Sequence, residues 1–320
     1  MVTLRDIESA RALLHGVTLR TPLLRSNLPE ERQIYVKPEC LQPVGSFKLR
    51  GAYNKIASLT PEERGRGVVA HSSGNHAQGV AYAARMQGVK ATIVMQAAAP
   101  AIKLEATRAM GAEVLTVGPA REERIRKAED LEKERGLTPV PPYNDEKIIA
   151  GQGTIGLEIL DEMPFPGVVL VPVGGGGIIS GIATAIKEQN PRVKVIGVEP
   201  EFAADARASF KSGKIQAVSG EDAARTLADG LRSQSIGPIN FEHIRKYVDD
   251  MITVSEGEIR AAMRQLLFST RVLAEPSGAV TTAAAMFHAS ELPGSGPYVA
   301  VVSGGNIEPK LFTEILMEKQ

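Results

Sequence analysis

Lys48 lies in an unusual setting for a lysine, between the turn 43–47 and a run of helical apolar spacing that ends at Leu59. Burial of the amine beside Phe47 would lower the pKa of the ammonium, and a neutral amine can attack an aldehyde. Gly45 and Ser46 offer N–H groups and a hydroxyl at a helix start, where an anion binds well. These features suit an aldehyde that carries a phosphate, such as pyridoxal phosphate (PLP). A surface lysine that opens a helix explains this segment equally well.

A second polar segment, His71-Ser72-Ser73-Gly74-Asn75-His76, separates a predicted strand from a predicted helix. Backbone N–H groups at a helix start can hold a carboxylate, because the helix dipole favours an anion there. Ser72 or Ser73 could instead cap the helix. Two serines and an asparagine exceed what a cap needs, so this segment favours a binding site.

Four consecutive glycines, Gly174 to Gly177, follow a predicted buried strand. Such a run costs backbone entropy, and close approach of a phosphate explains it. A dinucleotide site fits poorly, since the third glycine of that motif would fall at Ile179 or Ser180. No Lys-Ser/Thr pair follows, so the loop is not a nucleoside-triphosphate loop either. The segment predicts a site for a compact phosphate.

Two further segments allow more than one interpretation. Ser303 opens a polar turn after the last predicted strand, and its hydroxyl could bind a ring nitrogen or simply belong to a turn. Glu199 and Asp205 flank Ala203, so two carboxylates and a carbonyl offer oxygen ligands for Mg²⁺ or Ca²⁺. A solvated acidic loop is the more common explanation of that pattern.

Composition narrows the class of protein. The chain has 320 residues, 43% hydrophobic and 23% charged, with 37 basic and 37 acidic residues, so no charge excess points to nucleic acid. Aromatic residues are 4%, which makes a base-stacking surface unexpected. Cys40 is the only cysteine, which excludes an internal disulfide and fits a reducing compartment. Without an apolar signal core or a membrane-length apolar run, we expect a cytoplasmic protein that does not bind membranes.

Strands and helices alternate along the chain, which is typical of parallel sheets with helices on their faces. The expected strands are 34–37, 67–70, 91–95, 113–117, 168–173, 193–198 and 298–302. The expected helices are 4–15, 49–59, 75–86, 102–110, 121–135, 148–160, 178–189, 258–268 and 279–287, with a last one at the C-terminus. The proline-rich segment 139–142 separates two series, and residues 200–250 have no assigned element. The fold class is therefore α/β, with two parallel-type sheet lobes, flanking helices and a ligand in the cleft between them.

Several motifs in one order resemble the serine/threonine dehydratase and serine racemase family of PLP enzymes, which has the tryptophan-synthase-β-like fold. They are Gly45-Ser46-Phe47-Lys48-Leu49-Arg50-Gly51-Ala52, Ser72-Ser73-Gly74-Asn75-His76-Ala77-Gln78-Gly79, Ala150-Gly151-Gln152-Gly153-Thr154, Gly174-Gly175-Gly176-Gly177 and Ser303-Gly304-Gly305-Asn306. The resemblance spans nearly the whole chain. We expect residues 1–62 and 146–320 to form a large cofactor-binding domain and residues 63–145 a small domain.

The resemblance implies that Lys48 binds PLP covalently, and that Lys48 and Ser73 are the catalytic residues. The other cofactor contacts that it implies are Phe47, Asn75, Asn144, Gly174, Gly175, Gly176, Gly177, Gly230, Glu275 and Ser303. The substrate would be bound by Ser72, Ser73, Gly74, Asn75 and His76. Glu199, Ala203 and Asp205 match the racemase's divalent-cation pattern, which strengthens the case for Mg²⁺ or Ca²⁺.

By the same resemblance the protein is an ammonia-lyase that eliminates water from L-serine and L-threonine, and a homodimer. A serine racemase with dehydratase side activity and a 3-hydroxyaspartate dehydratase remain alternatives, as does an inactive PLP-binding protein. Arg121 and Arg124 could reach the second carboxylate of 3-hydroxyaspartate, although a solvated helix face is the more common explanation of such a pair. Ser73 resembles the racemase-type residue, whereas threonine dehydratases of the biosynthetic type usually have alanine at this position. Pro43 and Val44 replace the Lys-Thr pair of the racemase nucleotide site, so nucleotide activation is not expected.

Overall fold

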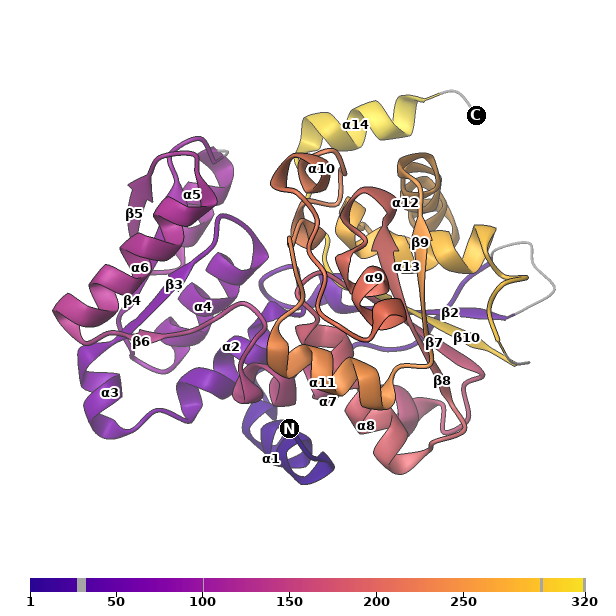
Figure 1. Ribbon diagram of the computed structural model, residues 1–320, viewed down its shortest axis with the longest axis horizontal. Helices are drawn as coiled ribbons and strands as arrows, with labels where there is room; N and C mark the ends of the chain where they lie inside the picture. Colours follow the sequence, from indigo (N-terminus) through magenta and orange to yellow (C-terminus); the bar gives the residue numbers. More distant parts are fainter. Residues whose placement is uncertain (28–32, 100, 294–295, 319–320) are drawn as a thin grey trace.

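A computed structural model of the chain describes residues 1–27, 33–99, 101–293 and 296–318. Two β-sheets organise it (Figure 1). The larger sheet has the order β1-β2-β10-β7-β8-β9, and all its neighbours pair in parallel except β1 and β2. Its strands are β1 (Leu24–Arg25), β2 (Ile34–Pro38), β7 (Val168–Pro172), β8 (Lys194–Pro200), β9 (Asp250–Val254) and β10 (Tyr298–Val302).

The smaller sheet is wholly parallel and has the order β5-β4-β3-β6. Its strands are β3 (Val68–His71), β4 (Ala91–Gln96), β5 (Glu113–Val117) and β6 (Thr138–Pro139). We call this sheet with its flanking helices the small lobe, and the six-stranded sheet with its helices the large lobe; they lie side by side in Figure 1. The expected α/β class with two mostly parallel sheets is confirmed.

Helices cover both faces of the large sheet because successive strand residues point to opposite sides. One face packs Val168 and Leu170 against α12 (Glu256–Thr270) and α13 (Pro276–Phe287). The other face packs Val169 and Val171 against α7 (Glu146–Glu162), α8 (Gly177–Gln189) and α11 (Pro238–Tyr247). The same alternation in the small lobe places Val68 toward α4 (Asn75–Met86) and Val69 toward α6 (Arg121–Arg135).

Helix α2 (Lys48–Ala57) packs against both lobes. Its buried apolar side chains Leu49, Ala52 and Ile56 join the core of the small lobe. On another side it lies so close to α7 that a Cβ on Gly151 would be 2.7 Å from the Gly51 Cα. The helix that begins at Lys48 is therefore shared between the lobes, although the sequence-based domain boundary at residue 62 assigns it to the large domain.

The predicted elements agree well with those described. The helices Asn75–Met86 and Arg121–Arg135 and the strands Glu113–Val117 and Tyr298–Val302 have the predicted bounds. Three other predicted helices are present with slightly different bounds or with bounds that the sequence did not define: α1 (Leu4–Leu14), α5 (Ala101–Ala109) and α14 (Pro309–Met317). Strands β1, β6 and β9 were not predicted, nor were the helices α9 (Asp205–Ser212), α10 (Gly220–Ala224) and α11; α3 (Pro61–Arg66) is a short additional helix. Among the described residues no helix is long and apolar enough to cross a membrane.

Candidate active site

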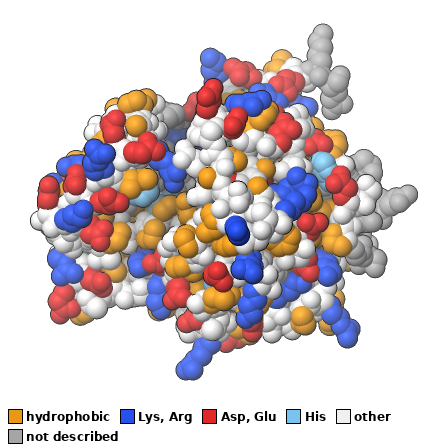
Figure 2. Space-filling model, in the orientation of Figure 1, with side chains coloured by type: hydrophobic (Ala, Val, Ile, Leu, Met, Phe, Trp, Pro, Cys, Tyr) orange, Lys and Arg blue, Asp and Glu red, His pale blue; other side chains and the backbone are white. Residues whose placement is uncertain are grey.

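A cavity of about 640 Å³ lies where strands β3, β4, β7 and β10 end, between the two lobes. This is the edge at which parallel α/β sheets bind ligands. The predicted site residues that line it are Phe47, Lys48, Ser72, Ser73, Gly74, Asn75, His76, Gly174, Gly175, Gly176, Gly177, Gly230, Glu275 and Ser303. Asn144, Glu199, Ala203 and Asp205 are absent from its lining. Outside this cavity, basic and acidic side chains are interspersed over the face that Figure 2 shows.

Lys48 is the first residue of α2 and points its amine into this cavity. Its Nζ donates a hydrogen bond to the Pro142 carbonyl oxygen at 2.8 Å and lies 5.0 Å from the centroid of the Phe47 ring. Burial lowers the pKa of the Lys48 ammonium to about 8. An appreciable fraction of the amine is therefore neutral and nucleophilic near neutral pH.

The turn before Lys48 is held by a segment far away in the sequence. The Phe47 N–H donates to the Ser303 carbonyl at 3.0 Å, and the Gly305 N–H donates to the Gly45 carbonyl at 2.9 Å. Gly45 has a φ of +69°, and the Asn306 side chain occupies the space that a Cβ there would need. These contacts bring Lys48 and Ser303 to one cavity.

The turn at residues 71–76 joins β3 to α4. Among the described residues no side chain caps α4: its N-cap is Gly74, and Ser72 Oγ accepts from the Gly74 N–H at 3.3 Å. The capping explanation of these serines is therefore wrong. Because this helix start faces the cavity without a side-chain cap, it is suited to an anionic group.

Ser73 has two hydrogen-bond donors at its side-chain oxygen. The Gln96 N–H donates to Ser73 Oγ at 3.0 Å, and Arg124 Nη1 lies 3.4 Å from the same atom. A nearby cation and hydrogen-bond donors both favour the deprotonated form of a hydroxyl. His76 differs, since its Nε2 bonds the Val140 carbonyl at 2.8 Å, and burial together with the Lys48 charge lowers its pKa to about 3. We expect His76 to be neutral and to anchor the turn.

Asn75 and Glu275 form a pair across the cavity. Asn75 Nδ2 donates to Glu275 Oε1 at 2.6 Å, and Asn306 Nδ2 donates to Asn75 Oδ1 at 2.8 Å. Burial, with a contribution from the Asp229 charge, raises the pKa of Glu275 to about 8. Glu275 is thus largely an uncharged acid at neutral pH, next to the Asn75 amide.

The glycine loop joins β7 to α8, and its geometry explains part of the run of glycines. Gly176 has a φ of +93° and is the N-cap of α8, and no side chain in the described part of the protein caps this helix. A Cβ on Gly175 would lie 2.2 Å from Cδ1 of Tyr143, so the Tyr143 ring rests directly on the loop. The loop therefore provides both an uncapped helix N-terminus and a seat for an aromatic ring.

Tyr143 lines the cavity and was not predicted. The neighbouring residue Asn144, which the resemblance implied, lies elsewhere: its Oδ1 accepts from the Ile239 N–H at 3.0 Å at the start of α11. The only sequence signal for Tyr143 is its place just after Pro141 and Pro142. Which of two adjacent residues faces the cavity depends on how this loop packs against the glycine loop.

Three basic side chains of the small lobe also line the cavity: Lys103, Arg121 and Arg124. Lys103 forms an ion pair at 2.9 Å with Asp229 of the large lobe. Burial, then the charge of Arg121, lowers the pKa of Arg124, and its Nε has no hydrogen-bond partner among the described residues. Arg121 and Arg124 are thus partly exposed residues of α6 that also belong to the cavity wall.

The acidic segment lies outside the cavity, and it is not a solvated loop, because Glu199, Ala203 and Asp205 are all 0% exposed. Glu199 accepts from the N–H groups of Ala206 and Arg207 at 3.0 and 2.7 Å. Neither carboxylate oxygen of Asp205 has a hydrogen bond of good geometry among the described residues, although the backbone N–H groups of Asp205 and Ile236 lie near enough to oppose part of the rise in its pKa. Burial raises the pKa of both carboxyl groups, and the charge of Asp205 adds to the shift at Glu199. In the part of the chain described, no three His, Cys, Asp or Glu side chains gather as a metal site.

The chain is similar to known proteins over most of its length. Residues 15–304 match the model of the family described as pyridoxal-phosphate dependent enzyme. L-Threonine ammonia-lyase of Thermotoga maritima is 48% identical over 99% of this chain and 78% of its own. L-threo-3-hydroxyaspartate ammonia-lyase of Saccharomyces cerevisiae is 38% identical, over 99% and 97%. The structure of maize serine racemase superposes with a TM-score of 0.92 at 35% identity, covering 98% of this chain and 96% of that one.

The family match covers most of the chain, and its cofactor fits what the cavity contains: an amine of lowered pKa beside two uncapped helix N-termini. The chain therefore belongs to the family of pyridoxal-phosphate dependent enzymes.

Proposed function

We propose that the protein is a PLP-dependent ammonia-lyase that removes water from L-threonine and L-serine, giving a 2-oxo acid and ammonia. One observation carries this proposal: the Lys48 amine, whose pKa burial lowers to about 8, shares a cavity with the uncapped N-termini of α4 and α8. An amine that binds an aldehyde and two separate anion sites match the cofactor's aldehyde, its phosphate and the substrate carboxylate. L-Threonine ammonia-lyase activity in a relative at 48% identity supports the same substrate class.

Different residues would bind the cofactor and the substrate. Gly174 to Gly177 and the N-terminus of α8 would hold the phosphate, and the start of α4 at Ser72 to Asn75 would hold the substrate carboxylate. When bound, PLP supplies an electron sink for the substrate α-carbon. Lys48 would bind the cofactor aldehyde covalently and, when free, its Nζ can take the α-proton, since its pKa is about 8.

Ser303 would set how strongly the cofactor withdraws electrons. Ser303 is buried, and its Oγ lies 3.4 Å from the Ser277 carbonyl oxygen, to which it donates. A hydroxyl, unlike a carboxylate, leaves a pyridine nitrogen mostly unprotonated. The weaker electron sink favours prompt elimination over a long-lived carbanion.

Two alternatives each rest on a specific contact. Arg124 and Arg121 line the cavity, and Arg124 Nη1 lies 3.4 Å from Ser73 Oγ, so a second carboxylate of 3-hydroxyaspartate would meet positive charge there. Serine racemisation is supported by Ser73, whose Oγ accepts from Gln96 N and Arg124 Nη1 and so is suited to act as an acid or base. We place both behind threonine and serine elimination.

The test is a product assay on the holoenzyme with each enantiomer of serine, threonine and 3-hydroxyaspartate. We expect 2-oxo acid and ammonia from L-threonine and L-serine. Lys48→Ala should lose turnover by several orders of magnitude, because nucleophile and base disappear together. Lys55→Ala is the matched control, since Lys55 lies on the same helix but pairs with Asp145 outside the cavity. Normal turnover in Lys48→Ala would contradict the proposal.

We further propose a divalent cation, Mg²⁺ or Ca²⁺, held by Glu199, Asp205 and the backbone carbonyl of Ala203. Two buried carboxyl groups whose like charges disfavour one another, with neither Asp205 oxygen in a hydrogen bond of good geometry among the described residues, support a missing positive charge there. We also propose that the enzyme is a cytoplasmic homodimer. Residues 63–145 contain every strand of the small lobe, which supports the proposed small domain.

A further inference from the structure

Arg50 lies on α2, two residues after Lys48, and points away from the cavity. Two residues correspond to about 200° around an α-helix, so the two side chains leave the helix on nearly opposite sides. Arg50 is 0% exposed, and its guanidinium lies among β2, α7 and the segment that leads into β1. The arginine thus ties the first turn of α2 to the large lobe, whereas the Lys48 amine bonds the Pro142 carbonyl oxygen at the cavity.

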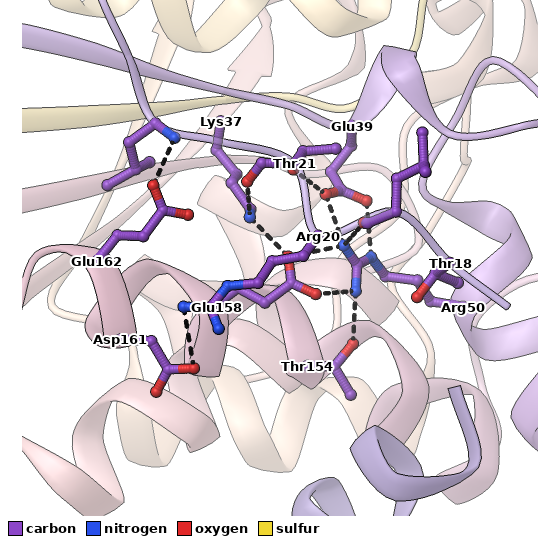
Figure 3. Close-up of polar contacts among 12 residues, drawn as sticks. Thr18, Arg20, Thr21, Lys37, Glu39, Arg50, Thr154, Glu158, Asp161 and Glu162 are labelled. Carbon is purple, nitrogen blue, oxygen red and sulfur yellow. Dashed lines mark hydrogen bonds and ion pairs between the residues drawn. The ribbon is translucent and has the colours of Figure 1, made fainter. Parts of the chain in front are cut away.

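Figure 3 shows the Arg50 guanidinium between two carboxylates, Glu39 and Glu158. Arg50 Nε and Nη2 donate to the two oxygens of Glu39 at 2.7 and 2.9 Å. Arg50 Nη1 and Nη2 donate to the two oxygens of Glu158 at 2.7 and 2.9 Å. The remaining contacts go to Thr154 Oγ1 at 3.0 Å and to the Leu19 carbonyl oxygen at 3.2 Å.

Both carboxylates are themselves fixed. Glu39 follows β2 and accepts from Thr21 Oγ1 at 2.8 Å, while Glu158 on α7 accepts from Lys37 Nζ at 2.6 Å. Burial alone would raise the pKa of Glu39, but the charge and hydrogen bonds of Arg50 outweigh it, so the pKa lies below its usual value. Both partners of Arg50 are thus anchored to the frame of the large lobe.

Neutral hydrogen bonds also join the start of α2 to that frame: the Gly51 N–H donates to Gln152 Oε1 of α7 at 3.2 Å, and the Phe47 N–H donates to the Ser303 carbonyl oxygen at 3.0 Å. The N-cap of α2, Phe47, makes no side-chain capping bond, and the apolar face of the helix packs on the small lobe. The bonds of Arg50 differ from these neutral bonds because they join charged groups, and charged hydrogen bonds are stronger than neutral ones.

We propose that Arg50 is a positioning residue: by bridging Glu39 and Glu158 it holds the first turn of α2, and with it the Lys48 amine, in place at the cavity. This inference rests on the proposed function of Lys48. A lysine cannot replace Arg50, because a single ammonium cannot bond two carboxylates edge to edge.

The test compares Arg50→Lys with Lys37→Met. Lys37 is equally buried and pairs with Glu158 in the same network, but it has no hydrogen bond to α2. Each apoenzyme is titrated with PLP, and covalent loading at Lys48 is followed by visible absorbance across pH, with folded protein quantified by circular dichroism. Borohydride reduction and peptide mapping identify the lysine that is loaded.

We expect Arg50→Lys to slow covalent loading by about 10- to 100-fold, because displacement of a reacting group slows a reaction by such factors. The apparent pKa of loading should rise above about 8, because the Lys48 amine becomes less buried. Lys37→Met should lose thermal stability yet load at the wild-type rate and pH midpoint. Glu39→Gln, a milder change that touches Arg50 but not Lys37, should fall between them and serves if Arg50→Lys does not fold. Equal loading in the arginine and lysine variants overturns the inference. If the wild type does not load at Lys48, the proposed function itself fails, which is a separate outcome.

Discussion

Ser73 illustrates how a single residue can decide which reaction the cavity supports. Racemisation needs an acid or base on each face of the planar α-carbon, whereas elimination needs a base on one face only. Under the proposed function Lys48 would act on one face, and the Ser73 hydroxyl, which accepts from Gln96 N and Arg124 Nη1, would act on the other. The Ser73 hydroxyl thus has two hydrogen-bond donors that stabilise its deprotonated form, as a serine acting as an acid or base needs.

We therefore predict that the wild type forms D-serine from L-serine at a detectable rate and that Ser73→Ala does not. Elimination of L-serine should survive in this variant, because Lys48 still acts from its own side. Chiral chromatography of the products measures both activities in one reaction. Equal loss of the two would show that Ser73 only helps to bind the carboxylate.

Tyr143 gives a second prediction for a single side chain. Its ring rests on Gly175, so Tyr143→Ala leaves a gap over the loop that would hold the phosphate. We expect PLP affinity to fall about tenfold in Tyr143→Ala. This change corresponds to a binding free energy of about 1.4 kcal/mol, which is typical of the loss of one packed side chain. Tyr143→Phe keeps the ring and should bind PLP as the wild type does. Fluorescence titration of the apoenzymes measures this, and equal affinity in all three would remove the proposed role.

At the scale of elements, helix contacts near the site depend on glycines that admit a neighbouring backbone. A Cβ on Gly181 of α8 would lie 2.3 Å from the Ile149 carbonyl oxygen and 2.4 Å from the Gly153 nitrogen, both on α7. Gly181→Ala should therefore cost about 1–3 kcal/mol or more, since the backbone of α7 must move. Gly257→Ala in α12 is the control, because that position has no atom within 4 Å and alanine favours helix. Denaturant unfolding of both variants measures the difference.

The N-terminal segment is attached to α11 and α8 through His243. Its Nε2 accepts from the Val2 N–H at 3.1 Å, and its Nδ1 lies 2.9 Å from Thr184 Oγ1. Burial, then the charge of the N-terminal amine, lowers the pKa of His243 to about 4. Between pH 6.5 and 4 the unfolded state binds a proton that the folded state does not, so stability falls as the pH drops through this window.

We predict that His243→Gln, which retains an acceptor but cannot be protonated, flattens the pH dependence of unfolding between pH 6.5 and 4. The difference should be at most about 3 kcal/mol, the value of the pKa shift in free energy. Urea unfolding at several pH values measures it. An unchanged slope would assign the acid sensitivity to other groups, such as His76.

For the whole molecule, the proposed cation joins the end of β8 to the start of α9 at a distance from the cavity. A cation bound only by the folded state raises its stability by mass action. We predict that EDTA lowers the melting temperature of the wild type more than it lowers turnover, and that Mg²⁺ or Ca²⁺ restores it. Asp205→Asn should abolish this response. Elemental analysis without metal, together with an unchanged melting temperature, would rule the site out.

Much of this protein could be predicted from local patterns in its sequence. The strand Tyr298–Val302 and the helix Asn75–Met86 have the predicted bounds, because apolar periodicity and turn residues act within a few positions. The residues of the two candidate anion sites were predicted as well, because runs of serine or glycine next to a helix start are typical of anion binding. The ordered motifs carried the family assignment.

Tertiary structure alone decided the rest. The two-residue strands β1 and β6 are too short to have a period, and they exist because neighbouring strands pair with them. Tyr143 faces the cavity instead of Asn144 because its ring packs on Gly175, a contact that spans 32 positions of the chain. From the sequence, Arg50 is an ordinary helical residue. Only the tertiary structure brings Glu39 and Glu158 to its two sides. Contacts between distant segments determine which side chains meet, and no local pattern in the sequence encodes them.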